Sequence, residues 1–210
     1  MRLATSILLA GILVTALGYA MTHHPAQKGV GFTVHYNQIY ISQDEHSLDA
    51  QIVRYERSDS TWKEVSTYYK RDGSVGAVKT NFSLNDKGIF SVDEKHQRLV
   101  LSGERYHTAH HPTADEIKSD PHFVREDSVL GYNTLVQHFA DGDGFSEFYL
   151  SPELNGVVLK AVYESGEGYQ TVVEATQIEL GEPSENEFIV PNYPMDTSSY
   201  ETNKGRLAPK

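Results

Sequence analysis

Hydrophobic and polar residues alternate along most of this chain between residues 30 and 180. In the first such segment Val30, Phe32, Val34 and Tyr36 are apolar and the residues between them are mostly polar. A period of two places every second side chain on the same face of a β-strand. Comparable segments follow at 48–57, 62–70, 75–83, 89–92, 98–102, 129–139, 145–150, 157–163 and 169–180. The pattern therefore predicts an all-β domain of about ten strands.

Short turn signals separate most of these segments. Arg71-Asp72-Gly73, Asp141 to Gly144, Asn155-Gly156 and Gly166 to Gly168 each stand between two expected strands. Asn and Gly tolerate the positive φ of tight hairpin turns, so neighbouring strands are expected to be antiparallel. The expected fold is an antiparallel meander that forms a half-barrel or an open barrel, and the pattern also allows a sandwich.

The alternation stops between Glu104 and Ser128, a polar segment that we expect to be an insertion in the meander. Thr113 and Glu116 have the spacing of a capping box, in which both side chains bind the first free amides of a helix. Ile117 is the one apolar residue of that helix, and Asp120-Pro121 is expected to end it. We expect one or two short helices in residues 104–128, laid over an edge or mouth of the sheet.

The N-terminus carries an uncharged run from Leu3 to Met21 behind Met1-Arg2. This run resembles a bacterial export signal, with Gly18 and Ala20 at the −3 and −1 positions of a cut after Ala20. It is also close to the length of a membrane-spanning helix. We expect residues 1–20 to be a signal peptide or an N-terminal membrane anchor, 21–29 a linker, 30–194 a single β domain and 195–210 a disordered tail. The protein is then exported to the periplasm or the cell exterior, with anchoring to the inner membrane as the alternative.

Composition excludes several classes of function. The chain has 18 basic and 29 acidic residues and a net charge of −11, which disfavours binding to nucleic acid. It has no cysteine, which excludes disulfides, thiolate metal sites and a cysteine nucleophile. Contact with a membrane is expected only through the N-terminal segment.

The sequence contains no recognisable catalytic motif. Gly-x-Ser-x-Gly, Ser-x-x-Lys and His-Glu-x-x-His are absent, and no glycine-rich loop opens a helix after a strand. We therefore predict no catalytic residues and no cofactor, and we expect the protein not to be an enzyme.

Histidines in the polar insertion are the only candidates for a metal site. They are His107, His110, His111 and His122. No further residue is fixed as a third ligand, so we favour a solvated loop and keep a metal-dependent enzyme as a lesser alternative.

Tyrosines are numerous, at 13 in the chain, and lie in many of the expected strands. An aromatic ring with a polar tip suits both a ligand-binding surface and ordinary half-buried strands. The candidate ligand-binding residues are Tyr36, Tyr55, Trp62, Tyr68, Tyr132, Tyr149 and Tyr163. Glu147 lies among them, but Phe148 and Leu150 define the core face of that strand, so Glu147 is expected to face water.

Three stretches resemble a group of uncharacterised exported bacterial proteins. These stretches are Leu130-Gly131-Tyr132, then Glu147-Phe148-Tyr149 with Pro152-Glu153-Leu154, then Glu182-Pro183 with Phe188 and Pro191. This group is in turn distantly similar to the periplasmic lipoprotein-carrier superfamily (LolA/LolB-like). The resemblance implies an antiparallel half-barrel around an apolar cavity with helices as a lid, and it implies no catalytic residue.

The sequence thus favours an exported, non-enzymatic binding protein of the cell envelope. Its curved sheet is expected to hold an apolar ligand: a lipid, a lipidated segment or a hydrophobic peptide. The alternative is a structural or interaction module of the envelope without a cavity, with an envelope protein as partner.

Overall fold

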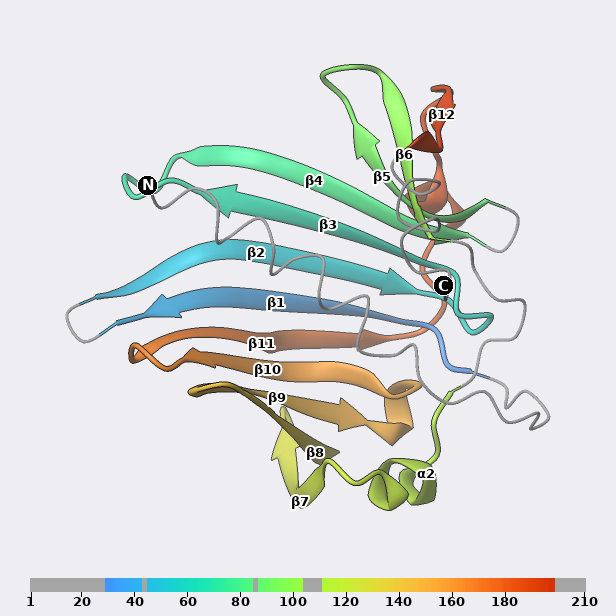
Figure 1. Ribbon diagram of the computed structural model, residues 1–210. Helices are drawn as coiled ribbons and strands as arrows, with labels where there is room; N and C mark the ends of the chain where they lie inside the picture. The colour runs from blue at the N-terminus through green and yellow to red at the C-terminus, as the bar shows by residue number, and fades with distance from the viewer. Residues whose placement is uncertain (1–28, 43–44, 85–86, 104–110, 199–210) are drawn as a thin grey trace, which may run out of the picture.

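The computed structural model describes residues 29–42, 45–84, 87–103 and 111–198. Twelve strands in this described part form one sheet, in the order β12-β6-β5-β4-β3-β2-β1-β11-β10-β9-β8-β7. The sheet is mostly antiparallel, and Figure 1 shows it as a curved layer. It does not close into a barrel. The predicted all-β, half-barrel fold is therefore confirmed.

The sheet consists of two meanders that meet in its middle. The first runs outward from β1 to β6, and the second returns from the opposite edge, from β7 to β11. Strands β1 and β11 pair antiparallel, from Phe32 opposite Leu180 to Ile41 opposite Gln170. The strands of the first meander are β1 (Phe32–Ile41), β2 (His46–Glu56), β3 (Trp62–Tyr69), β4 (Val75–Leu84), β5 (Gly88–Asp93) and β6 (Arg98–Gly103). Those of the second are β7 (Phe123–Val129), β8 (Tyr132–Asp141), β9 (Gly144–Ser151), β10 (Val157–Ser165) and β11 (Tyr169–Leu180).

The polar insertion is the crossover between the two edges of the sheet, and it contains the expected helix. Helix α2 (Ala114–Ser119) begins at Thr113, whose side chain accepts a hydrogen bond from the Glu116 amide. The Glu116 carboxylate accepts one from the Thr113 amide in return, so the predicted capping box is confirmed. Asp120 is the C-terminal cap.

The expectation that the insertion extends as a loop to Ser128 is wrong from Phe123 onward. Residues 123–129 form the edge strand β7, and Val124 to Ser128 are exposed. An edge strand with both faces in water needs no alternation of polar and apolar residues, which is why the pattern did not reveal it.

Short elements complete the chain. A 3-10 helix, η1 (Pro152–Leu154), precedes Asn155 and Gly156, which have positive φ values of 57° and 74° as the turn signal predicts. A second, η2 (Glu185–Phe188), follows β11. Within the segment expected to be a tail, Met195–Asp196 forms β12 and pairs parallel with β6.

The N-terminal segment of residues 1–28, expected to hold the signal peptide and most of the linker, lies outside the described residues. Among the residues that are described, no helix has the length and hydropathy needed to cross a membrane.

The sheet has two faces, which we name from β1. The inner face carries Phe32, Val34 and Tyr36, and the outer face carries Thr33, His35 and Asn37. A large core cluster extends from β2 and β1 across the second meander to Val129 of β7, and it includes Ile117 of α2. A smaller cluster of Phe82, Phe90 and Leu99 is covered by Val190 and Tyr193 of the C-terminal segment.

Candidate ligand-binding face

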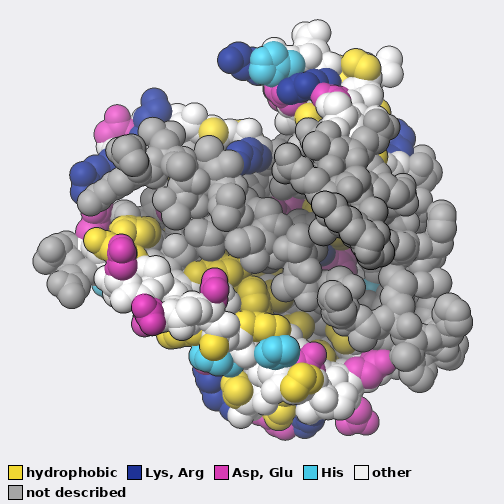
Figure 2. All heavy atoms as spheres, viewed as in Figure 1, with side chains coloured by type: hydrophobic (Ala, Val, Ile, Leu, Met, Phe, Trp, Pro, Cys, Tyr) yellow, Lys and Arg dark blue, Asp and Glu magenta, His cyan; other side chains and the backbone are white. Residues whose placement is uncertain are grey.

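Apolar side chains form a continuous surface on the inner face of the middle strands, which we call the apolar half. Strand register places Val34 opposite Ile178, Ala161 opposite Val173, and Phe148 opposite Ala161. Phe32, Val34 and Leu159 are fully buried. Figure 2 shows hydrophobic side chains gathered in a hollow near the centre of this view. The apolar half comprises Phe32, Val34, Tyr36, Phe148, Leu150, Leu159, Ala161, Tyr163, Val173, Ala175 and Ile178.

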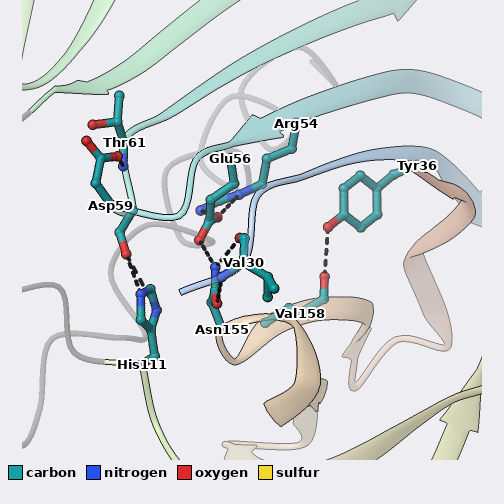
Figure 3. Close-up of polar contacts among 10 residues, drawn as sticks. Val30, Tyr36, Arg54, Glu56, Asp59, Thr61, His111, Asn155 and Val158 are labelled. Atoms are coloured by element: carbon teal, nitrogen blue, oxygen red, sulfur yellow. Dashed lines mark hydrogen bonds and ion pairs between the residues drawn. The ribbon is translucent and has the colours of Figure 1, made fainter. Parts of the chain in front are cut away.

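Tyr36 crosses this surface. It lies opposite Ala175 on β11, and that small side chain leaves room for the tyrosine ring to pass over it. The Tyr36 hydroxyl donates a hydrogen bond of 3.1 Å to the Val158 carbonyl on β10 (Figure 3). Burial raises the pKa of Tyr36 far above its usual range, so the hydroxyl stays protonated and acts as a donor.

Charged and polar side chains gather on the inner face of β2 to β4, beside the apolar Ala50 and Ile52 of β2, and we call this set the polar half. Register places Glu56 opposite Trp62, Arg54 opposite Glu64, and Glu64 opposite Asn81. The inner face therefore changes from apolar to charged between β1 and β2. The polar half comprises Arg54, Glu56, Trp62, Glu64, Ser66, Tyr68, Lys79 and Asn81.

Arg54 and Glu56 form an ion pair in the polar half (Figure 3). Arg54 Nε and Nη2 donate to the same Glu56 oxygen at 3.0 and 2.7 Å, and the guanidinium lies 4.7 Å from the centre of the Trp62 ring. Burial lowers the pKa of Arg54, but the acidic groups around it, Glu56 first and then Tyr36 and Glu64, together outweigh burial, so the net pKa is raised. The second Glu56 oxygen accepts a hydrogen bond from Asn155. Arg54 is thus a fixed cation whose charge Glu56 neutralises.

Glu64 faces the same surface, but within the described residues it makes no ion pair of the kind that Glu56 makes with Arg54. Burial raises the pKa of Glu64, while Arg54 and hydrogen bonds from Asn81 and Ser66 lower it without cancelling the effect of burial. A carboxylate that loses water is destabilised in its charged form unless cations and hydrogen bonds compensate in full.

Tyr163 carries a buried hydroxyl at the opposite side of the inner face. Its oxygen has no hydrogen-bond partner within the part of the chain that the structure describes, and burial raises the pKa of Tyr163 to about 12. Its ring packs edge-on against Phe148, with the ring centres 5.7 Å apart.

The structure divides the seven predicted ligand-binding residues between the two faces. Tyr36, Trp62, Tyr68 and Tyr163 lie on the inner face. By register and strand alternation, Tyr55, Tyr132 and Tyr149 lie on the outer face. The structure also places on the inner face two residues that were not selected from the sequence, Arg54 and Glu64. The alternation along β2 could have indicated Arg54, because it lies two residues after Ile52 and therefore on the same face of the strand.

Glu147 lies on the outer face, opposite to Phe148 as expected, but it is not freely solvated. Arg125 donates to both of its oxygens at 2.9 and 2.8 Å, and the Tyr149 hydroxyl donates to it at 3.1 Å. The Glu147 side chain is only 15% exposed. Hydrogen bonds from Arg125 lower the pKa of Glu147 to about 2. The outer face therefore holds a structural ion pair at this point.

The histidines of the insertion are not gathered into a metal site in the described part of the chain. His111 Nε2 lies 2.9 Å from the Ser60 hydroxyl (Figure 3), whereas His122 contacts Asp120 and stacks on Phe139. Among the described residues no group of three or more potential ligands could hold a metal ion. His107 and His110 lie outside the described residues.

Comparison with known proteins finds likeness in fold only. No protein-family model matches the sequence, and no curated protein matches it. Among solved structures, the complex of Pseudomonas aeruginosa MucA/MucB is 15% identical, with a TM-score of 0.45 over 78% of this chain and 56% of that chain. PNGF-II is 16% identical, with a TM-score of 0.49 over 83% of this chain and 33% of that chain. A LolA superfamily protein from Nitrosomonas europaea is 9% identical, with a TM-score of 0.39 over 79% of this chain and 92% of that chain.

This chain therefore spans about half of the MucA/MucB chain and a third of PNGF-II. A LolA superfamily protein is thus among the solved structures to which this chain is similar, in line with the resemblance expected from the sequence. At these identities the likeness concerns the fold alone.

Proposed function

We propose that this protein is an exported, non-enzymatic binding protein of the cell envelope that holds an apolar ligand on the inner face of its sheet. The observation that carries the proposal is the apolar half, a continuous apolar surface across β1, β11, β10 and β9. The described strands form one sheet, so no second sheet covers this surface as it would in a sandwich. Phe32, Val34 and Leu159 are already shielded from water, so a ligand on this surface would take the place of the groups that shield them and would keep the same apolar area buried.

A lipid acyl chain suits this surface better than a polar ligand. The apolar half presents aromatic and aliphatic side chains, and its polar atoms are few: the Tyr36 hydroxyl is bound to a carbonyl, and the Tyr163 hydroxyl is buried. A lipidated segment or a hydrophobic peptide would use the same surface. The surface offers an apolar ligand a complementary shape and burial from water.

Export is supported by the sequence, through the uncharged run from Leu3 to Met21 and its small residues at Gly18 and Ala20. The proposal places the β domain in the periplasm, with the membrane contacted only through the N-terminal segment if that segment is retained. Mass measurement of the protein from the envelope fraction tests this. A mass equal to that of a chain beginning at Met21 indicates a cleaved signal. Recovery of the protein from the cytosol contradicts export.

Binding can be tested by extracting the purified protein with organic solvent and identifying bound lipids by mass spectrometry. Displacement of a fluorescent fatty-acid analogue then measures affinity. Ala161→Gln adds a polar side chain to the inner face, where Ala161 is 1% exposed, and is expected to weaken binding about tenfold or more. Lys160→Gln introduces the same side chain on the outer face of the same strand and is the matched control.

The competing function, an envelope interaction module without a ligand, predicts a different result. In that case the extract contains no stoichiometric lipid, the analogue does not bind, and Ala161→Gln and Lys160→Gln behave alike. Circular dichroism of both variants confirms that they remain folded.

A further inference from the structure

Tyr163 brings a hydroxyl group into the apolar half and leaves it without a partner. No residue within 29–42, 45–84, 87–103 or 111–198 forms a hydrogen bond with this buried oxygen. The ring is held edge-on by Phe148, with the two ring centres 5.7 Å apart. A buried hydroxyl that makes no hydrogen bond lowers stability, and such exceptions in a native fold are expected mainly at functional sites. The Tyr163 hydroxyl is therefore a candidate contact for a ligand.

The end of the inner face at Tyr163 is less covered than the part next to it. Two residues back along β10, Ala161 is 1% exposed, and its neighbour Phe148 on β9 is 6% exposed. Tyr163 itself lies between Ser146 on β9 and Thr171 on β11, and all three are half-buried. The polar end of a ligand can therefore lie in this row of residues and keep part of its contact with water.

Aromatic rings flank the hydroxyl groups of this row on both sides. On β1, Tyr40 lies opposite Thr171 and stacks on Tyr169, with ring centres 6.0 Å apart. On β8, Phe139 lies opposite Ser146. Hydroxyl groups between apolar rings suit a small polar group that is joined directly to an apolar chain.

The apolar half extends away from Tyr163 along β11. Val173, Ala175 and Ile178 of this strand belong to it, and Ile178 lies opposite Val34 on β1. A strand rises roughly 3.3 Å per residue, so roughly 20 Å separate Thr171 from Ile178. An extended acyl chain can lie along this length while its polar end stays beside Tyr163.

The charge at this end of the sheet disfavours an anionic polar end. The β8–β9 turn and the β10–β11 turn lie against each other, because Gly166 packs directly on the Asp143 side chain. Residues 140–145 and 164–169, which contain these turns, include Asp141, Asp143, Glu164 and Glu167 and no Lys or Arg. A carboxylate placed beside Tyr163 would therefore meet like charges.

The hydroxyl acts as a donor. Burial raises the pKa of Tyr163 to about 12, so the group stays protonated at neutral pH. A carbonyl oxygen accepts a hydrogen bond and brings no hydrogen that needs a partner of its own, unlike the hydroxyl of an alcohol.

We propose that Tyr163 donates a hydrogen bond to the carbonyl oxygen of an uncharged acyl ester, whose acyl chain lies along β10 and β11 on the inner face. This inference rests on the proposed function, because it names the polar end of the apolar ligand proposed there. It distinguishes an esterified acyl chain from a free fatty acid, whose carboxylate is charged at neutral pH.

The test compares methyl laurate, laurate and tridecane, which have similar apolar chains and end in an ester, a carboxylate and a methyl group. Affinities are measured by displacement of the fluorescent analogue, below the aggregation concentration of each probe. Tyr163→Phe removes only the hydroxyl group. This variant is expected to bind methyl laurate about tenfold more weakly than wild type does, and to bind tridecane with unchanged affinity. Wild type should bind laurate more weakly than methyl laurate.

Tyr149→Phe is the matched control, because it removes the same group from the outer face, where the hydroxyl contacts Arg125 and Glu147. It should bind methyl laurate and tridecane as wild type does. Infrared spectroscopy of bound, carbonyl-labelled methyl laurate reports the hydrogen bond directly. The carbonyl stretching frequency should be lower in wild type and in Tyr149→Phe than in Tyr163→Phe.

The outcomes separate this inference from the function on which it rests. If none of the three probes binds to wild type, the proposed function fails as well. The ester contact alone is overturned, while apolar binding stands, in any of three cases: Tyr163→Phe keeps the wild-type affinity for methyl laurate, the carbonyl frequency is the same in all three proteins, or laurate binds more tightly than the ester.

Discussion

Tyr149 and Tyr163 lie on opposite faces of the sheet, and their hydroxyl groups differ in hydrogen bonding. The Tyr149 hydroxyl accepts a hydrogen bond from Arg125 at 2.8 Å and donates one to Glu147. The Tyr163 hydroxyl is buried without a partner in the described residues. A buried hydroxyl that loses water and makes no hydrogen bond lowers stability.

We therefore expect Tyr163→Phe to raise the free energy of unfolding by about 1 kcal/mol, and Tyr149→Phe to lower it by about 1 kcal/mol. Urea denaturation at neutral pH measures both. A loss of stability in Tyr163→Phe would contradict the prediction and would indicate a partner outside the described part of the chain.

Glu147 gives a second prediction at this scale, for the dependence of stability on pH. The pKa of Glu147 is lowered from 4.5 to about 2 in the folded protein, chiefly by hydrogen bonds from Arg125. A carboxyl group whose pKa is lower in the folded than in the unfolded state stabilises the fold at pH values above its unfolded-state pKa. This contribution is lost as the pH falls from about 4.5 towards 2. The full shift corresponds to about 3 kcal/mol, but Arg125 is 43% exposed, so we expect about 1 kcal/mol after screening.

The measurement compares wild type with Glu147→Gln by chemical denaturation between pH 5 and the acid limit of folding. Wild type should lose more stability than the variant as the pH falls. Asp93, whose pKa Arg98 and His96 hold at about 2, titrates in both proteins, so the difference between them reports Glu147. Parallel curves for the two proteins would refute the assignment.

At the scale of elements, the turn between β9 and β10 is tied to the start of β1 by one side chain. Asn155 accepts a hydrogen bond from the Val30 amide at 2.9 Å and donates one to the Val30 carbonyl at 2.8 Å (Figure 3). It therefore pairs with the backbone as a neighbouring strand would. Its own φ of 57° is a left-handed conformation that Asn and Gly tolerate.

Two variants separate these roles. Asn155→Gly keeps the left-handed conformation and removes the hydrogen bonds, so it should lower the free energy of unfolding by about 1–2 kcal/mol. Asn155→Ala removes the same bonds and adds backbone strain of about 1 kcal/mol. Thermal and urea denaturation should rank them as wild type, then Gly, then Ala. Equal stability of the two variants would mean that the turn relaxes.

Elements with strong local signals could be predicted from the sequence, and those without such signals could not. The capping box at Thr113 and the turn at Asn155-Gly156 depend on a few adjacent residues and were foreseen. Strand β7 was missed because Val124 to Ser128 are exposed and show no alternation. The face on which Tyr163 lies relative to Tyr36 depends on the register shift between β1 and β11 next to His35, where β11 has one extra residue, and no local pattern reveals it.

At the scale of the whole molecule, the open sheet predicts that the protection of backbone amides from hydrogen exchange decreases from its central strands to its edges. Strands β1 and β11 are central and are paired on both sides, whereas β7 and β12 are the two edges. Hydrogen exchange followed by mass spectrometry should therefore be slowest in β1, β11 and β10 and fastest in β7 and β12. Uniform protection across all strands would contradict this order.

The pairing of β1 with β11 could not be predicted from the alternation alone. A meander read along the chain places each strand beside its sequence neighbours, and most of them do lie so. The exception brings His35 beside Gln177, far apart in sequence, and leaves the crossover between β6 and β7 to connect the two edges. The candidate site depends on this exception, since the apolar half extends across both sides of it.

Because of the same arrangement, the chain can be divided into two fragments that each contain consecutive strands. Residues up to Gly103 and residues from His111 onward contribute separate sets of consecutive strands, joined through β1 with β11 and, at one corner, β6 with β12. Two polypeptides co-expressed with a break between those points should reassemble by strand complementation. The inner face of the assembled sheet would then contain strands from both fragments. Binding of an apolar ligand would therefore show that the two fragments have associated.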